Sequence, residues 1–223
     1  MNPNRKPGFF DYGGKLWSWC QSLLSLILLN LLFIVGCVPV LTIGTSLLAL
    51  MELSIDRARY GGEVFPVFKE FWQAYKRHLG RGIPLTIALV LVFGSLFLDY
   101  LWLAGGTTLF QGLFGLLGAV TVILCMILVY YIPLLSSGNY RLWDGVIEAF
   151  FASFSHWARS LPTALALVAL VVLCLLIPNL YLALLPVMIV IGFALMGMAL
   201  AAIVESTLPD AENDDEEYEE EDE

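Results

Sequence analysis

Charged side chains are scarce in this sequence. Only 14% of its 223 residues are Asp, Glu, Lys or Arg, whereas 59% are apolar. A typical soluble domain has about 25% charged residues. Eleven of the 20 acidic residues lie in 210–223, which leaves nine acidic and 11 basic side chains in residues 1–209. This shortage excludes an ordinary water-soluble globule and indicates a polytopic α-helical membrane protein, because an isolated charge in hydrocarbon is costly.

Groups that bind metals or form covalent intermediates are also few. The four cysteines lie in apolar segments without a Cys-x-x-Cys pair, and the two histidines have no neighbouring thiol. No phosphate-binding, dinucleotide-binding, metalloprotease or serine-hydrolase motif occurs. We therefore expect a protein that is not an enzyme, uses no cofactor and no metal, and binds no nucleic acid.

Long apolar segments are what the sequence does contain. A membrane-spanning helix needs about 20 apolar residues. Five segments without Lys or Arg meet this need: residues 17–38, 83–104, 113–135, 161–177 and 182–204. A sixth segment, 40–55, is shorter, contains Glu52 and follows Pro39, so it is either a tilted span or a re-entrant half-helix.

The positions of the basic residues favour six crossings. Lys and Arg occur in three clusters, within 5–15, 57–81 and 141–159. Six crossings place every one of them on the side of both termini, which the positive-inside rule identifies as the cytoplasm. We predict an all-α bundle in the cell membrane, with six transmembrane helices in three hairpins over residues 17–204. A cytoplasmic segment (1–16) precedes it, and a disordered acidic tail (205–223) follows it.

The first span raises one alternative. Residues 34–37, Ile-Val-Gly-Cys, are similar to a lipoprotein cleavage site that follows a basic segment and an apolar core. A mature lipoprotein begins with a polar tether, whereas here residues 38–41 lead straight into more apolar sequence. We therefore expect the first span to be retained.

Two amphipathic segments repeat along the chain. Phe68, Phe71, Trp72 and Tyr75 share one helical face, and Phe150, Phe154 and Trp157 share another. Such aromatic stripes predict cytoplasmic helices that lie at the membrane interface. Each stripe is followed by a proline, Pro84 or Pro162, which are 78 residues apart, and then by a pair of spans. This order is typical of parallel internal repeats.

Three polar residues in or near the apolar segments are candidates for function: Asp99, Asn30 and Glu52. Asp99 has no basic residue in an adjacent span. We expect Asn30 to form a helix–helix hydrogen bond, and Glu52 to pair or snorkel beside Arg57 and Arg59. Small residues at 112, 115 and 118, and at 197 and 201, permit close helix approach within the bundle or between copies of the chain.

Two motifs resemble the YesL family of bacterial integral membrane proteins. They are residues 38–44 (Val-Pro-Val-Leu-Thr-Ile-Gly) and residues 68–76 (Phe-Lys-Glu-Phe-Trp-Gln-Ala-Tyr-Lys). The resemblance covers about 9–204, and the departures from the pattern are His78 and the acidic tail. It implies a protein of uncharacterised activity, encoded beside carbohydrate uptake systems and sensor kinases in Gram-positive bacteria, with no catalytic residues.

The leading hypothesis is a non-enzymatic accessory of carbohydrate uptake or sensing. Its expected partners are the lipid bilayer and a sugar transporter subunit or a sensor kinase. A homo-oligomer is a further alternative that the sequence leaves open. The residues expected to dock such a partner are Thr42, Gly44, Phe68, Phe71, Trp72, Tyr75, Phe150, Phe154 and Trp157. The alternative is a small-solute permease with Asp99, Asn30 and Glu52 as the polar lining of its path.

Overall fold

A computed structural model of the protein describes residues 15–60, 66–104, 108–138 and 140–205, and these residues contain no strand. The elements are α1 (Lys15–Cys37), a 3-10 turn η1 (Val40–Thr42), α2 (Ile43–Tyr60), α3 (Val67–Ala104), α4 (Thr108–Ser136), α5 (Leu142–Ser155), α6 (Trp157–Leu176), α7 (Pro178–Val187), a π-helical turn η2 (Met188–Gly192) and α8 (Phe193–Glu205). An all-α fold is therefore confirmed for this part of the chain. The predicted acidic tail and most of the predicted N-terminal segment lie outside the described residues.

Five stretches of the described chain are long and apolar enough to cross a membrane. They are Cys20–Cys37, Val67–Trp102, Gly115–Ser136, Trp157–Cys174 and Leu182–Ile203. They include the five segments that the sequence favours, to within a few residues at most ends. The sixth segment lies in α2, which also carries four charged residues and is not among them. The sixth crossing, the hairpin arrangement and the cytoplasmic position of both termini stay predictions.

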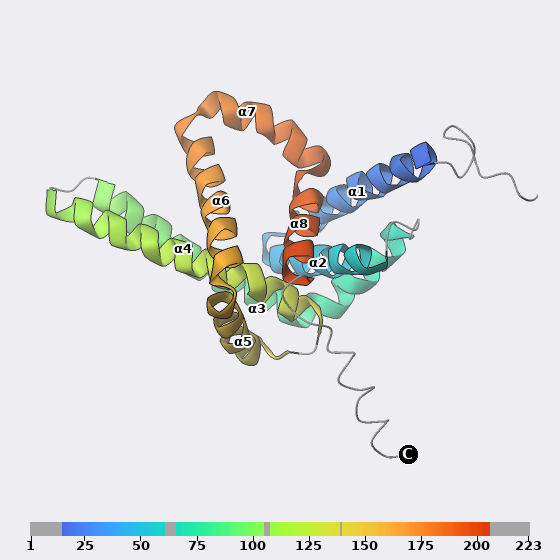
Figure 1. The fold of residues 1–223 in the computed structure, drawn as a ribbon, viewed down its shortest axis with the longest axis horizontal. Helices are drawn as coiled ribbons and strands as arrows, with labels where there is room; N and C mark the ends of the chain where they lie inside the picture. The colour runs from blue at the N-terminus through green and yellow to red at the C-terminus, as the bar shows by residue number, and fades with distance from the viewer. Residues whose placement is uncertain (1–14, 61–65, 105–107, 139, 206–223) are drawn as a thin grey trace, which may run out of the picture.

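Helix α2 occupies the centre of the molecule. It packs against α1, α3, α4 and α8, and Figure 1 shows it near the middle of the molecule beside these helices. Its residues Leu48 to Met51 are almost completely buried. Leu50 belongs to one apolar cluster with α1 and the start of α3, whereas Leu48 belongs to a second cluster with α4 and α5. A helix with four charged residues is thus held by apolar contacts on several sides.

The sequence predicts that the first amphipathic segment is a separate helix, but the structure shows that it is not. It continues into the following span as the 38-residue α3, with Pro84 inside the helix. A proline removes one backbone N–H, and neighbouring helices and polar side chains can make its loss tolerable in a membrane helix. The second amphipathic segment does form its own helix, α5, because the backbone departs from helical angles at His156 (φ −108°, ψ 37°). Pro162 lies inside α6.

The C-terminal part of the described chain forms an arch. Helix α6 leads to α7, which crosses to α8, as Figure 1 shows. Residues 178–181 form the start of α7, with Pro178 at its first position. This position suits proline because its missing N–H would have no partner within the helix.

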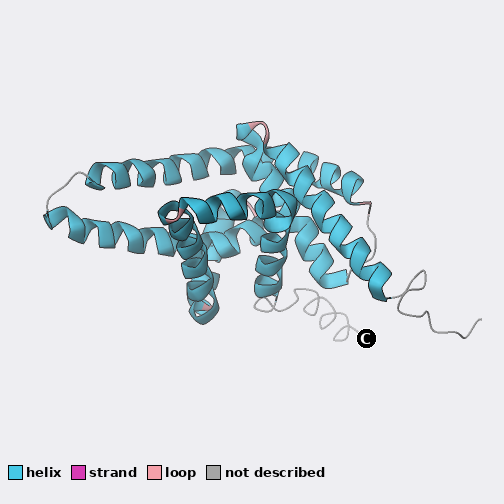
Figure 2. Cartoon of the chain, turned by 90° about the horizontal axis from the view of Figure 1, so that it is seen from above, coloured by secondary structure: helices cyan, strands magenta, loops and turns pink. Residues whose placement is uncertain are grey.

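Helices α3 and α4 form a long hairpin that extends away from the centre (Figures 1 and 2). At the start of α4, a Cβ at Gly115 would meet no atom within 4 Å, and a Cβ at Gly118 would lie 3.8 Å from the Tyr100 hydroxyl of α3. In α8, by contrast, a Cβ at Gly197 would lie 2.9 Å from Ser54 Oγ of α2. The close approach expected at Gly197 is therefore made inside the chain.

Candidate functional site

Helices α2 and α3 cross at a pair of glycines. A Cβ on Gly44 would lie 2.5 Å from the Gly82 carbonyl oxygen, and one on Gly82 would lie 2.5 Å from the backbone nitrogen of Thr45. Gly44 opens α2, where backbone N–H groups lack helical partners. Its N–H donates to Thr86 Oγ1 of α3 at 2.8 Å, and that hydroxyl donates to Gly82 O at 2.9 Å. Glycine on both helices thus allows the two backbones to touch, and it allows the buried Thr86 hydroxyl of α3 to cap the first turn of α2.

The turn before this crossing is held by Thr42. Its hydroxyl lies 2.9 Å from the carbonyl oxygen of Gly36 and 2.8 Å from that of Pro39. It can therefore donate a hydrogen bond to the backbone at the end of α1 or just after it. Together with Gly44, this assigns a structural role to the 38–44 motif. Gly44 is buried, because α3 occupies the space beside its Cα atom. It therefore cannot contribute to the expected docking surface.

Glu52 of α2 binds two side chains from α3. Its Oε1 accepts a hydrogen bond from Arg77 Nη1 at 2.7 Å, and its Oε2 lies 2.7 Å from His78 Nε2. His78 is only 1% exposed, whereas the side chain of Arg77 is 65% exposed. The sequence predicts instead that Glu52 pairs with Arg57 or Arg59, or snorkels beside them. Those residues are five and seven positions further along the same helix, outside the i, i+3 and i, i+4 spacings at which side chains of one helix are neighbours.

We expect Glu52→Ala to lower the free energy of unfolding by about 2 kcal/mol, because a buried imidazole loses its charged partner. The exposed Arg77 contributes little to this figure, since solvent screens it. Thermal and denaturant unfolding of the purified protein in mild detergent measure the change. Glu148→Ala, at an exposed position of α5, is the control and should change stability by less than about 0.5 kcal/mol.

A double variant tests the cause. Glu52→Ala combined with His78→Phe removes both buried polar partners, so it should cost less than the sum of the two single variants. Additive costs would contradict a specific Glu52–His78 interaction. Wild-type stability of Glu52→Ala would do the same.

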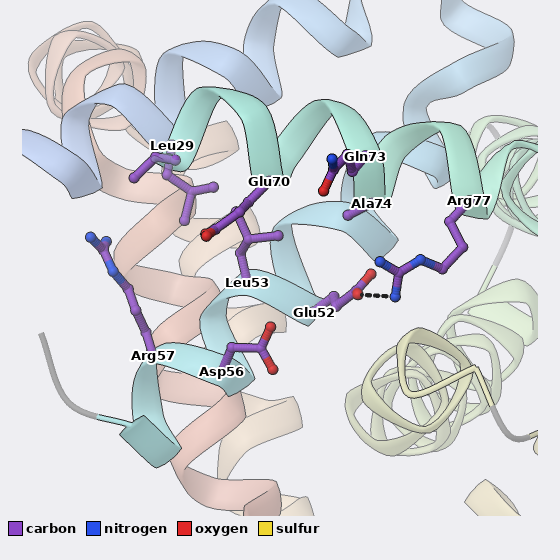
Figure 3. A pocket seen from close by; sticks show the side chains of 10 residues that line it. Leu29, Glu52, Leu53, Asp56, Arg57, Glu70, Gln73, Ala74 and Arg77 are labelled. Carbon is purple, nitrogen blue, oxygen red and sulfur yellow. Dashed lines mark hydrogen bonds and ion pairs between the residues drawn. The ribbon is translucent and has the colours of Figure 1, made fainter. Parts of the chain in front are cut away.

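Next to this pair lies a pocket of about 300 Å³ between α2 and α3, shown in Figure 3. Five of its lining residues are charged, and all come from these two helices: Glu52, Asp56, Arg57, Glu70 and Arg77. Leu29, Leu53, Val67, Gln73 and Ala74 complete the lining. The pocket therefore combines both signs of charge with an apolar wall.

Arg57 is buried at the edge of this pocket. It is 9% exposed, and one of its amino groups, Nη2, donates to Ser25 Oγ of α1. The other, Nη1, has no hydrogen-bond partner among the described residues. Burial lowers the pKa of the guanidinium, and the Glu70 carboxylate opposes this shift. An arginine stays protonated at neutral pH even so, which leaves a buried cationic donor beside the pocket.

The other two candidate polar residues lie elsewhere. Asn30 of α1 is fully buried and donates from Nδ2 to the carbonyl oxygens of Met188 (3.0 Å) and Ile189 (2.6 Å) in η2. Its Oδ1 accepts from the backbone N–H of Ala194 in α8 at 3.0 Å. This is the helix–helix hydrogen bonding expected from the sequence. A π-turn leaves backbone groups unpaired, and Asn30 supplies partners for them.

Asp99 is exposed and lies near the far end of α3. Asn30, Glu52 and Asp99 are thus not brought together: one is bound to backbone at η2, one lines the α2–α3 pocket and one faces outward. The polar path that a permease would need is not formed by these three residues in the described structure.

The two aromatic stripes have different surroundings. In the first, Phe71 and Tyr75 are 0% and 9% exposed and pack on α1 and α2. They are removed from the expected docking surface, because they are part of the core. Phe68 and Trp72 remain exposed, and Trp72 stacks on Tyr75 at a centroid distance of 5.0 Å.

The second stripe faces away from the protein. The opposite side of α5 consists of Gly145, Ala149 and Ser153, which are buried. A Cβ on Gly145 would lie 3.3 Å from Tyr131 of α4, and Ser153 Oγ donates to Met126 O of α4 at 3.0 Å. Small residues therefore anchor α5. The aromatic residues that point outward, which we call the α5 aromatic face, are Trp143, Phe150, Phe151 and Phe154 of α5 together with Trp157, the first residue of α6.

The structure adds detail to the predicted repeat. The shift of 78 residues that relates Pro84 to Pro162 also relates Glu70 to Glu148, His78 to His156 and Arg81 to Arg159. The same shift takes Glu52 to Tyr130. His78 contacts Glu52, and His156 stacks on Tyr130 at a centroid distance of 6.4 Å. Both histidines thus contact the same position of the preceding long helix, but only the first copy places a carboxylate there.

Comparison with known proteins gives one match. Residues 26–100 match a family described as a protein of unknown function, DUF624. The matched segment contains most of α1, all of α2 and most of α3, and therefore the glycine crossing and the pocket. No curated protein and no solved structure matches the chain significantly. The family is uncharacterised, and the narrower resemblance to YesL proteins stays a prediction.

Proposed function

We propose that the protein is a non-enzymatic membrane accessory that binds another membrane protein through the α5 aromatic face. The observation that carries the proposal is the exposure of this face on a helix that is firmly anchored. Trp143 is 81% exposed, Phe151 65% and Trp157 62%. Large exposed apolar patches mark sites of protein or membrane interaction, and tryptophan is enriched among the residues that dominate binding energies.

The partner we propose is a sugar transporter subunit or a sensor kinase. Support for this choice comes from the resemblance of residues 38–44 and 68–76 to the YesL family, whose members are encoded beside such systems. The remaining exposed aromatic residues of the first stripe, Phe68 and Trp72, lie on α3 and offer a second, smaller contact.

Affinity purification of the tagged full-length protein from its own membranes in mild detergent tests the proposal. We expect the wild type to recover a sugar permease subunit or a sensor kinase. The triple variant Phe150→Ser, Phe154→Ser, Trp157→Ser should reduce this recovery by about tenfold or more, since loss of hot-spot residues costs over 1 kcal/mol each. The control variant, Asp144→Ser with Glu148→Ser, changes the charged side of the same helix and should recover as much partner as the wild type.

Two results would contradict the proposal. One is the absence of any permease or kinase from the wild-type sample, and the other is equal recovery by the triple variant. Brominated lipids give an independent readout in reconstituted vesicles. Strong quenching of fluorescence from Trp143 and Trp157, with no partner recovered, would assign the face to the bilayer alone.

A further inference from the structure

The pocket between α2 and α3 contains groups that the proposed function does not use. Glu52 is already engaged, because each of its carboxylate oxygens contacts a side chain of α3. The other end of the pocket is lined by Arg57 from α2 and Glu70 from α3. Figure 3 shows the Glu70 carboxylate pointing toward the side of the pocket on which the Arg57 guanidinium lies.

The unpartnered nitrogen of Arg57 points to an anionic ligand group. Leaving a buried donor without a partner is costly, and this cost is greater for a charged group. Nη1 is buried, lies on a residue that lines the pocket and has no partner among the described residues. Ser25 Oγ holds the neighbouring nitrogen in place and so orients the guanidinium. An arginine fork of this kind is well suited to phosphate.

The Glu70 carboxylate points to a cationic group on the same ligand. It belongs to the same pocket lining as Arg57 but comes from the facing helix, and it would repel a phosphate bound alone. A ligand that carries an ammonium group beside its phosphate satisfies both signs of charge. The volume of about 300 Å³ is at the lower end of that of small-molecule sites.

We propose that this pocket binds a phosphoethanolamine group, with the phosphate on Arg57 and the ammonium on Glu70. This group occurs free and as the headgroup of phosphatidylethanolamine. Leu29, Leu53 and Val67 give the pocket an apolar wall, which suits the glycerol and first acyl carbons of the lipid form. The proposal is independent of partner binding by α5.

Titration calorimetry of the purified full-length protein tests the free form. The probes are O-phosphoethanolamine, inorganic phosphate and ethanolamine. We expect O-phosphoethanolamine to bind more tightly than either fragment. Arg57→Gln should weaken its binding by about tenfold or more, as expected when a charge-assisted hydrogen bond is lost. Glu70→Gln should weaken the binding of O-phosphoethanolamine to a similar extent without weakening that of phosphate.

The repeat supplies a matched control. Glu148→Gln makes the same change at the position that corresponds to Glu70, on an exposed side of α5, and should leave binding unchanged. Arg141→Gln makes the same change as Arg57→Gln at an exposed basic residue, and it should also leave binding unchanged. Glu70 is partly exposed, so Glu70→Gln provides the test if Arg57→Gln fails to fold.

Nanodiscs of phosphatidylethanolamine or of phosphatidylcholine with the same acyl chains test the lipid form. The choline group has no N–H to donate, so only phosphatidylethanolamine should raise the unfolding temperature, and Glu70→Gln should remove the difference. Binding of the free probe alone, of the lipid alone or of both identifies the source. No response to either form in the folded wild type overturns the proposal, as does a response that Glu70→Gln and Arg57→Gln leave intact.

Discussion

Replacing Gly82 with alanine should destabilise the protein by about 3 kcal/mol or more, at the upper end of what overpacking costs. The new methyl group would meet the backbone of Thr45, which cannot rotate away as a side chain can. Helices α2 and α3 would have to move apart. That movement would also separate the Gly44 N–H from Thr86 Oγ1 and leave a buried donor unpaired.

The control for this prediction lies two residues away on the same helix. A Cβ at Gly80 would meet no atom within 4 Å, so Gly80→Ala should not destabilise the protein and should stabilise it by about 0.5 to 1 kcal/mol through the higher helix propensity of alanine. Thermal unfolding followed by size-exclusion chromatography in detergent compares the two variants. Equal unfolding temperatures for Gly82→Ala and wild type would show that the helices do not cross at this glycine pair.

Asn30→Leu should lower stability by about 2 to 3 kcal/mol. The change keeps the branching of the side chain but removes the partners of two carbonyl oxygens in η2 and of the Ala194 N–H. Interhelical hydrogen bonds in membranes average about 0.6 kcal/mol each and reach about 1.7. The three bonds together, with the cost of unpaired backbone groups, lead to the expected value.

A second measurement locates the effect of Asn30→Leu. A cysteine in place of Ala201, introduced after the four native cysteines are replaced, should react slowly with a maleimide in the wild-type background, because Ala201 is 0% exposed. It should react faster with Asn30→Leu if α8 loosens. Asn179→Leu, at an exposed position of α7, is the matched control. Unchanged labelling and stability in Asn30→Leu would contradict the role of Asn30 at the π-turn.

The apolar spans could be predicted from the sequence because their length is a local property. Five of them are found at nearly the predicted residues, and their boundaries follow changes in composition that any short window of sequence contains. The π-turn in the last span could not be found in this way. Its signal is a single amide, Asn30, more than 150 residues earlier in the chain.

Burial inside the helical domain was harder to predict than membrane insertion. Phe71 and Phe150 occupy similar stripes and have the same side chain, yet one is in the core and the other is 43% exposed. Apolar periodicity identifies a face but does not tell whether protein, lipid or a partner covers it. A signal was present beside α5, where Gly145, Ala149 and Ser153 mark the face that packs.

The pocket residues were only partly accessible to sequence reasoning. Glu52 was a candidate because a carboxylate near an apolar segment is expensive. Its partner His78 could not be assigned, since 26 residues separate them and the contact depends on how α2 crosses α3. The repeat offered a hint, because His78 and His156 have the same spacing as the two prolines.

The position of α2 has a consequence for biosynthesis. This helix emerges from the ribosome before the residues that bind Glu52 and pack on its glycine surface, which lie in α3. A segment with four charged side chains partitions poorly into lipid by itself. If α2 is the predicted sixth crossing, its stable insertion has to wait until residues 77–86 have been translated, and the first three helices then enter the bilayer as one unit rather than in succession.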